Sequence, residues 1–416
     1  MQEAFATATQ RPLLCSSCPI RMAVAEVSLF PADADRANAV PVCISEYCTA
    51  GRRTRRVYRC RGIDHMGDRV KLLAIGFVPP PLGGVSVSFK LFCDLVATQN
   101  RVDLQVINLS GIRARRSVKS VCALVRHIWK YAARCDVATL YCATSQIPTV
   151  GLLTLCLCRL RKKPFILRKA GGTDHRELGA FFGRVAEFVM KHADLFLAET
   201  KYLVDLNRRR GIVQTRWYPT TRRAAQLSDG RTRCRRFVFV GQVRLAKGVM
   251  ELVKASDRLP SGTSVDVYGP LFDDLPADLF EGRQRIFYKG ALKHEDVVPT
   301  LRQYDAFVLP TKAPTEGYPG AILEAYGAGL PVITTTCGAI PEIVDDTFGI
   351  LVEPGDAEAL AQAMNHLVSH DSAYQRLCCG ARDARERFSA EQWIAWFLQQ
   401  CRYLCRQDVG HARSCL

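Results

Sequence analysis

The order of apolar runs and helical periods predicts an α/β protein with two doubly wound, Rossmann-like domains. Short apolar runs alternate with helical segments from Val70 onward, and the same alternation starts again at Phe237. The runs are apolar throughout, which indicates parallel strands covered by helices on both faces. A chain of 416 residues is also long enough for two domains with separate cores.

The first series starts with an apolar strand at 71–77, followed by a loop rich in proline and glycine and a helical period at 85–97. Further strands are expected at 102–109, 137–141, 165–167 and 195–198. Ligands of such sheets bind at the carboxyl ends of the strands. We therefore expect the loops after these strands, including 168–174, to face the functional site.

The second series repeats this pattern. Its strands are expected at 237–240, 264–269, 286–290, 306–310, 331–335 and 349–352. The polar, arginine-rich stretch between the two series predicts a linker at 221–236.

The first 69 residues differ from the rest because they show no sustained period and contain ten arginines but no lysine. We expect an extension of low order. Its cysteines Cys15, Cys18, Cys43 and Cys48 form two pairs that allow a zinc site, although the pairs are further apart than in common zinc ribbons. Asp33-Ala34-Asp35 resembles a metal-binding acid pair, but no strand leads into it.

The net charge of +17 suggests nucleic acid as a partner, but the distribution of basic residues argues against it. They form short clusters, such as 113–116 and 159–163, without interleaved aromatic residues. These clusters are either solvated faces or a surface for anionic lipid.

No apolar run reaches the roughly 18 to 20 residues of a membrane span, and no secretory signal is visible at the N-terminus. We expect a cytoplasmic protein, and docking on the inner face of the membrane stays open as an alternative to solvated basic faces. The eighteen cysteines, among them Cys142, Cys156, Cys158, Cys337 and Cys378 in apparent core segments, are interpreted as reduced thiols.

Two carboxylates, Glu316 and Glu324, flank the segment Gly317-Tyr318-Pro319-Gly320 at the start of a predicted helix. Unpaired backbone N–H groups and the positive end of the helix dipole favour a phosphate there. The carboxylates would accept hydrogen bonds from hydroxyl groups on either side. The pattern indicates a nucleotide-sugar site, unless the two acids only complement the helix dipole.

This segment resembles the Glu-x7-Glu motif of the retaining glycosyltransferases of family 4. The resemblance continues in 237–248, in 330–333 and in the Gly-x-x-Pro-Glu turn within 337–344. It implies the two-domain GT-B fold, an acceptor domain at 70–220, a nucleotide-sugar domain at 237–388 and a final helix at 389–416 that returns to the first domain. It also implies retention of anomeric configuration and a nucleotide diphosphate sugar as donor, and no cofactor or metal motif is visible.

By position, the resemblance places Glu324 on the ribose, Glu316 on the transferred sugar and Lys247 on the diphosphate. The family's usual arginine is replaced by Gln242, so Arg244 is a substitute candidate. The other implied donor contacts are Gly317, Tyr318, Pro319, Gly320, Gly241, Lys289, Gly290 and Leu292. On the acceptor side they are Gly83, Gly84, Gly172 and Asp174, the last of which is equally suited to cap a helix.

The resemblance favours a glycosyltransferase that extends a lipid-linked oligosaccharide for cell-surface polysaccharide. Two alternatives stay open: a sugar-nucleotide epimerase of the same fold, and a catalytically silent protein that binds nucleotide sugar or nucleic acid.

Overall fold

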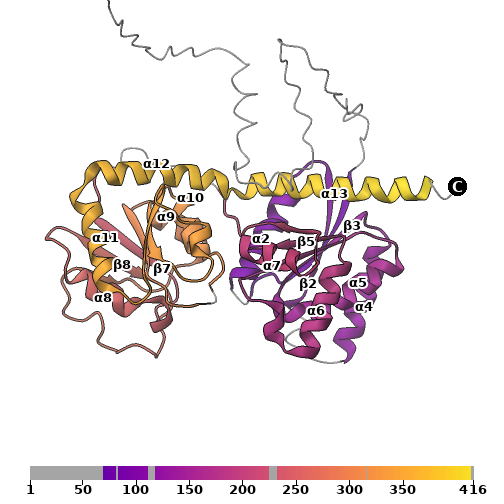
Figure 1. The fold of residues 1–416 in the computed structure, drawn as a ribbon, viewed down its shortest axis with the longest axis horizontal. Helices are drawn as coiled ribbons and strands as arrows, with labels where there is room; N and C mark the ends of the chain where they lie inside the picture. Colours follow the sequence, from indigo (N-terminus) through magenta and orange to yellow (C-terminus); the bar gives the residue numbers. More distant parts are fainter. Residues whose placement is uncertain (1–68, 81–82, 111–117, 224–231, 315, 414–416) are drawn as a thin grey trace, which may run out of the picture. The chain divides into compact units, whose positions relative to one another are not determined.

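A computed structural model describes residues 69–80, 83–110, 118–223, 232–314 and 316–413. Within them the chain forms two parallel sheets of six strands each, which confirms the predicted fold class (Figure 1). The first sheet has the order β2-β1-β3-β4-β5-β6. Its strands are β1 (Val70–Gly76), β2 (Val102–Asn108), β3 (Val137–Ala143), β4 (Phe165–Ala170), β5 (Leu195–Ala198) and β6 (Thr215–Trp217).

Alternating residues of the first sheet pack into two separate cores. Leu73 and Ile75 belong to one core, and Leu72 and Ala74 belong to the other, because successive side chains of a strand point to opposite faces. The first face is covered by α4 (Val118–Ala132), α5 (Leu152–Leu160), α6 (Ala180–His192) and α7 (Lys201–Arg209). The second face is covered by α2 (Gly84–Ala97) and by the C-terminal helix α13 (Ala390–Arg413).

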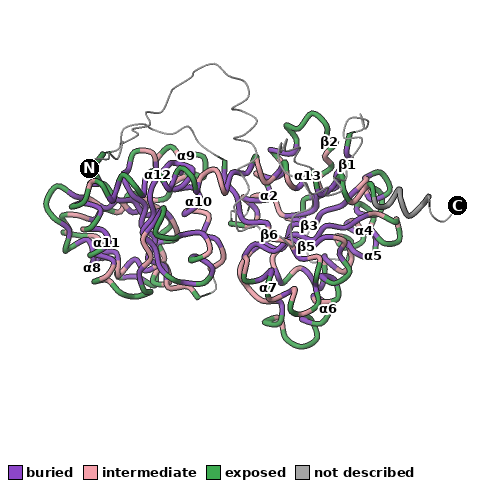
Figure 2. The backbone as a smooth tube through the Cα atoms, turned by 45° about the horizontal axis from the view of Figure 1, so that its top comes forward, coloured by how far each residue is buried: buried purple, intermediate pink, exposed green. Residues whose placement is uncertain are grey.

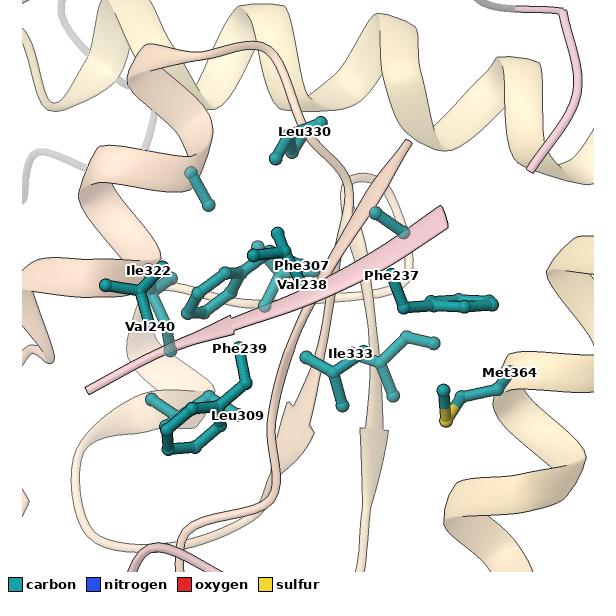
Figure 3. Packing of buried hydrophobic residues seen from close by; sticks show 14 of the residues in the cluster. Phe237, Val238, Phe239, Val240, Phe307, Leu309, Ile322, Leu330, Ile333 and Met364 are labelled. Atoms are coloured by element: carbon teal, nitrogen blue, oxygen red, sulfur yellow. The ribbon is translucent and has the colours of Figure 1, made fainter. Parts of the chain in front are cut away.

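The second sheet has the order β9-β8-β7-β10-β11-β12, and all its neighbours are parallel. Ile322 of α10 (Gly320–Gly327) and Met364 of α11 (Ala357–Ser369) pack from opposite sides of its central strands (Figure 3). The strands are β7 (Arg236–Val240), β8 (Ser264–Tyr268), β9 (Ile286–Tyr288), β10 (Ala306–Leu309), β11 (Val332–Thr335) and β12 (Gly349–Val352). The helices are α8 (Val249–Ser256), α9 (His294–Leu301), α10 (Gly320–Gly327), α11 (Ala357–Ser369) and α12 (Asp371–Arg387).

The central strands are the most buried segments of both halves, as Figure 2 shows, and the structure corrects two predictions. Arg168 and Lys169 do not follow β4 but belong to it, because β4 pairs with β3 as far as Ala170. Cys156 is exposed, since it lies on the outer side of α5. Strand β6 was not predicted, because three residues are too few to show a period.

Residues 1–68 of the predicted extension, with its cysteine pairs and Asp33-Ala34-Asp35, lie outside the described residues, which begin at Arg69. The cysteines of the described part are free thiols, and burial raises the pKa of the Cys142 thiol to about 12. Where the chain is described, none of its helices has the length and apolar character to cross a bilayer.

Candidate functional site

The strand order of the second sheet locates its ligand site. From β7 the chain moves outward to β8 and β9, and it then returns to β10 on the other side of β7. This is the 3-2-1-4-5-6 order of a doubly wound sheet, in which ligands bind where the order reverses. The loops after β7 and β10 meet at that point, and they carry Lys247 and Glu316.

Lys247 and Glu316 form an ion pair with side chains that are 21% and 14% exposed. Glu316 also accepts a hydrogen bond from Thr311 Oγ1 at 3.3 Å. The chain leaves Lys247 through Gly248, which has a φ of 74°. A Cβ there would lie 1.8 Å from the carbonyl oxygen of Pro310, so only glycine allows the two loops to approach this closely.

The backbone of Glu316 is held by the turn after β11. Its carbonyl accepts a hydrogen bond from the Ala339 N–H at 3.0 Å. Gly338 has a φ of 55°, and a Cβ on it would lie 2.3 Å from the same carbonyl. The loop formed by residues 316–319, here called the Glu316 loop, therefore depends on a glycine that follows the neighbouring strand β11.

Glu324 pairs with Arg222 in a buried ion pair. The Arg222 Nε donates to Glu324 Oε1 at 2.8 Å, and both side chains are 9% exposed. Arg222 also donates to Ser88 Oγ at 3.2 Å and to the Thr221 carbonyl at 3.0 Å. Helix α10 starts at Gly320, so Glu324 is its fifth residue and lies beyond the first turn.

Two glycine-containing loops, one from each sheet, are in contact. A Cβ on Gly172 would lie 3.2 Å from the Glu316 carbonyl oxygen, and one on Gly317 would lie 3.0 Å from the Gly172 nitrogen. Glu199 joins the same loops, because its carboxylate accepts the N–H of Gly171 and, at 3.0 Å, that of Tyr318. The prediction that the loop amides are unpaired is therefore wrong for Tyr318.

Tyr318 is held at its hydroxyl as well as at its amide. The hydroxyl donates to Glu342 Oε2 at 2.6 Å and accepts a hydrogen bond from Trp217 Nε1 at 3.1 Å. Burial and the neighbouring Glu342 carboxylate raise the pKa of Tyr318 far above its usual value, so the phenol stays a hydrogen-bond donor.

Two predicted basic residues have partners elsewhere in the second sheet. Arg244 pairs with Asp274 at 3.4 Å and lies over the Phe272 ring, 5.0 Å from its centroid. Lys289 lies 3.8 Å from Asp266 Oδ2. The structure thus brings Lys247 to Glu316 and directs Arg244 to an aspartate.

The acceptor-side candidates have structural partners of their own. Asp174 caps a short 3₁₀ helix and binds Arg210 through both oxygens, at 2.7 and 2.8 Å. Lys169, which neighbours this loop, is buried and donates to the Gly171 carbonyl at 2.7 Å. Its burial lowers its pKa to about 8, which is well below the usual range of a lysine.

The glycine candidates differ in how closely the chain approaches them. A Cβ on Gly84, the first residue of α2, would meet no atom within 4 Å, while the Gly241 carbonyl oxygen lies 1.7 Å from the position of a Cβ on Gly269. Gly290 has a φ of 83°, and the partly buried Leu292 packs against the core of the second sheet.

Sequence reasoning missed Glu199 and Arg222 and did not select Glu342 as a site residue. Glu199 offered a usable signal, because it is a carboxylate directly after the apolar strand β5. Arg222 was hidden in a stretch with many arginines.

Comparisons with known proteins point to a family and a fold. The family model described as "Glycosyl transferases group 1" matches residues 234–370. A sulfoquinovosyl transferase of Arabidopsis thaliana is 29% identical over 41% of this chain and 33% of its own length. A glycogen synthase of Mycobacterium tuberculosis is 29% identical over 44% of each chain. The chain thus spans less than half the length of these two relatives.

A solved structure gives the same fold over a larger share of the chain. HepE from Anabaena, crystallised with UDP, aligns with 80% of this chain and 100% of its own. The TM-score is 0.64 and the identity is 16%. At this identity the likeness is one of fold, and it agrees with the predicted GT-B arrangement.

Proposed function

Because the chain belongs to the group 1 glycosyltransferases, we propose that it transfers a sugar from a nucleotide diphosphate sugar to an acceptor hydroxyl with retention of configuration. The observation that carries this proposal is the ion pair of Lys247 and Glu316 where the strand order reverses, with Glu324 eight residues further on. This arrangement offers a cation that can bind a diphosphate and two carboxylates that can accept hydrogen bonds from hydroxyl groups.

Each group has a distinct chemical role in this proposal. In the reaction the bond between the sugar and the diphosphate breaks and negative charge develops on the diphosphate, while the acceptor oxygen bonds to the sugar carbon and its hydroxyl proton passes to the departing diphosphate. Lys247 stabilises that charge, and Arg244 would assist after it leaves Asp274. Glu316 holds hydroxyls of the transferred sugar, and Glu324 holds those of the ribose.

The remaining donor contacts come from backbone groups. The Glu316 loop, Gly320 and Gly241 would lie along the sugar and the diphosphate. The segment containing Lys289, Gly290 and Leu292 contacts the base. Because HepE was crystallised with UDP, uridine nucleotides are the first donors to test.

Thermal stabilisation by nucleotides tests the donor site directly. We expect one nucleoside diphosphate to stabilise the native chain by about 2.7 kcal/mol at a hundred times its Kd. Glu324→Ala should lose this stabilisation, while Glu358→Ala, which removes an exposed carboxylate on α11, should keep it. Stabilisation that is equal in both variants would contradict the assignment of Glu324.

Turnover tests the role of Lys247. Lys247→Met removes a charged hydrogen bond, so kcat/KM should fall about tenfold to a hundredfold. Lys254→Met, which changes an exposed lysine of α8, is the control and should keep full activity. Consumption of donor without any acceptor would favour an epimerase instead.

The exposed face of α6 supports a lipid-linked acceptor. Phe181, Phe182 and Phe188 are 72%, 50% and 48% exposed, and the exposed Arg184 and Lys191 lie among them. Aromatic side chains between basic ones suit an anionic membrane surface, where each basic residue contributes about 1 kcal/mol. We propose that the protein docks there and extends a lipid-linked oligosaccharide for cell-surface polysaccharide.

Vesicle binding tests this acceptor class. The native chain should sediment with phosphatidylserine vesicles at low salt and not with phosphatidylcholine vesicles. The double change Phe181→Ser and Phe182→Ser should weaken sedimentation, whereas Leu271→Ser, at an exposed leucine after β8, should not. Transfer to a soluble saccharide but to no polyprenyl diphosphate sugar would remove the lipid-linked acceptor.

A further inference from the structure

The N-terminus of α7 is capped by a residue from the other sheet. Thr200 accepts the Leu203 N–H at 3.1 Å, as a normal N-cap does. The N–H groups of Lys201 and Tyr202 instead donate to Glu342, at 2.5 and 3.0 Å. Glu342 belongs to the turn between β11 and β12, so a helix that packs on the first sheet depends on a carboxylate of the second.

The same carboxylate holds the Glu316 loop. Glu342 accepts the Tyr318 hydroxyl at 2.6 Å, and that hydroxyl accepts Trp217 Nε1 from β6. Glu199, which directly follows β5, holds the amide of Tyr318. The tyrosine is only 4% exposed, so both of its polar ends depend on these partners.

Tyr318 lies between the two carboxylates proposed to bind the donor. It follows Glu316 by two residues and directly precedes Pro319, the N-cap of the helix that carries Glu324. A shift of the tyrosine therefore moves Glu316 on one side and the start of α10 on the other. Catalytic groups tolerate only small displacements from a productive geometry.

We propose that Glu342 is a positioning residue: it sets the geometry of the Glu316 loop when the N-terminus of α7 docks on it. The proposal rests on the glycosyl transfer described above. The Glu342 carboxylate accepts three hydrogen bonds, two from the N–H groups at the start of α7 and one from the Tyr318 hydroxyl. The sheets thus approach through a contact that also orders the loop around the sugar.

Glu342→Gln tests this role at nearly constant size. Because the amide has one acceptor oxygen in place of two, kcat should fall about tenfold to a hundredfold. The Kd of the free nucleoside diphosphate, which lacks the sugar held by Glu316, should rise by a smaller factor than that by which kcat falls. Tyr318→Phe should lower kcat in the same direction and add little in the Glu342→Gln background, because both changes break one network.

The matched control is Asp356→Asn. Asp356 caps α11 by accepting the Ala359 N–H at 2.8 Å, and both residues belong to the second sheet's half of the chain. This change also weakens a carboxylate cap, yet it should leave kcat intact. Full kcat in Glu342→Gln, or an equal loss in both variants, would overturn the proposal.

Amide hydrogen exchange gives a readout that does not depend on turnover. In Glu342→Gln, the amides of 201–203 and of Tyr318 should exchange about tenfold faster than in the native chain, whereas Asp356→Asn should leave them unchanged. Unchanged exchange in Glu342→Gln overturns the positioning role. Absence of turnover of any nucleotide sugar by the native chain would instead refute the glycosyl transfer. The exchange result would still show whether Glu342 orders the N-terminus of α7 and Tyr318.

Discussion

Breaking the buried ion pair of Arg222 and Glu324 should destabilise the protein strongly. Arg222→Met keeps the apolar stem of the side chain but leaves the Glu324 carboxylate without its cation. The lost hydrogen bond is charge-assisted and 2.8 Å long, which contributes about 1.5 to 3 kcal/mol. The carboxylate is also only 9% exposed, and breaking such a pair from one side costs about 3 to 5 kcal/mol. We expect the free energy of unfolding to fall by about 3 kcal/mol.

Urea denaturation followed by tryptophan fluorescence measures this loss. The double variant Arg222→Met and Glu324→Gln removes both charges, so it should recover much of the stability that the single change loses. The exposed pair of Arg283 and Asp257 is the control, and Arg283→Met should cost less than about 1 kcal/mol. A loss below about 1 kcal/mol for Arg222→Met, or strictly additive single changes, would refute the reasoning.

Two further predictions concern Gly338, for which Gly282 is the control, and Lys169. Gly282→Ala should cost about 1 kcal/mol, since its φ is 66° but a Cβ would meet no atom within 4 Å. In urea denaturation, Gly338→Ala should lower the free energy of unfolding by about 1 to 3 kcal/mol more than Gly282→Ala does, because its Cβ would clash with the Glu316 carbonyl. It should also lower kcat/KM. Equal effects of the two alanines would exclude a role for this close approach. Burial lowers the pKa of Lys169 from 10.5 to about 8, so between these pH values the folded protein has lost a proton that the unfolded chain keeps. The free energy of unfolding should therefore rise with pH across this window, by up to about 3 kcal/mol, and Lys169→Met should lack this rise.

Much of the architecture could be predicted from the local sequence pattern. The apolar runs at 237–240 and 306–310 predicted central strands, and these became β7 and β10. The helical period at 85–97 predicted α2 to within one residue. Such elements are predictable because burial on both faces of a strand, or on one face of a helix, leaves a period in the sequence. Strand β6 has only three residues, which is too short for any period.

The residues of the candidate site could be predicted from the sequence to a smaller extent. Glu316 and Glu324 were recognisable because turn residues and a helix start lie between them. The partner of Glu324 was not, since Arg222 lies 102 residues earlier in the chain. Arg244 was a substitute candidate for the arginine that Gln242 replaces, yet its guanidinium pairs with Asp274.

The sequence by itself determined the two parallel sheets, the glycine turns after their strands and the pair of carboxylates that flank a helix start. These features depend on neighbours a few residues apart, so local composition and spacing encode them. Only the tertiary structure decided which carboxylate meets which cation and that Glu199, Arg222 and Glu342 join the Glu316 loop and α10 to the first sheet. These contacts link residues more than a hundred positions apart. They follow from strand order and from the packing of the crossover helices, which no local period of the chain records.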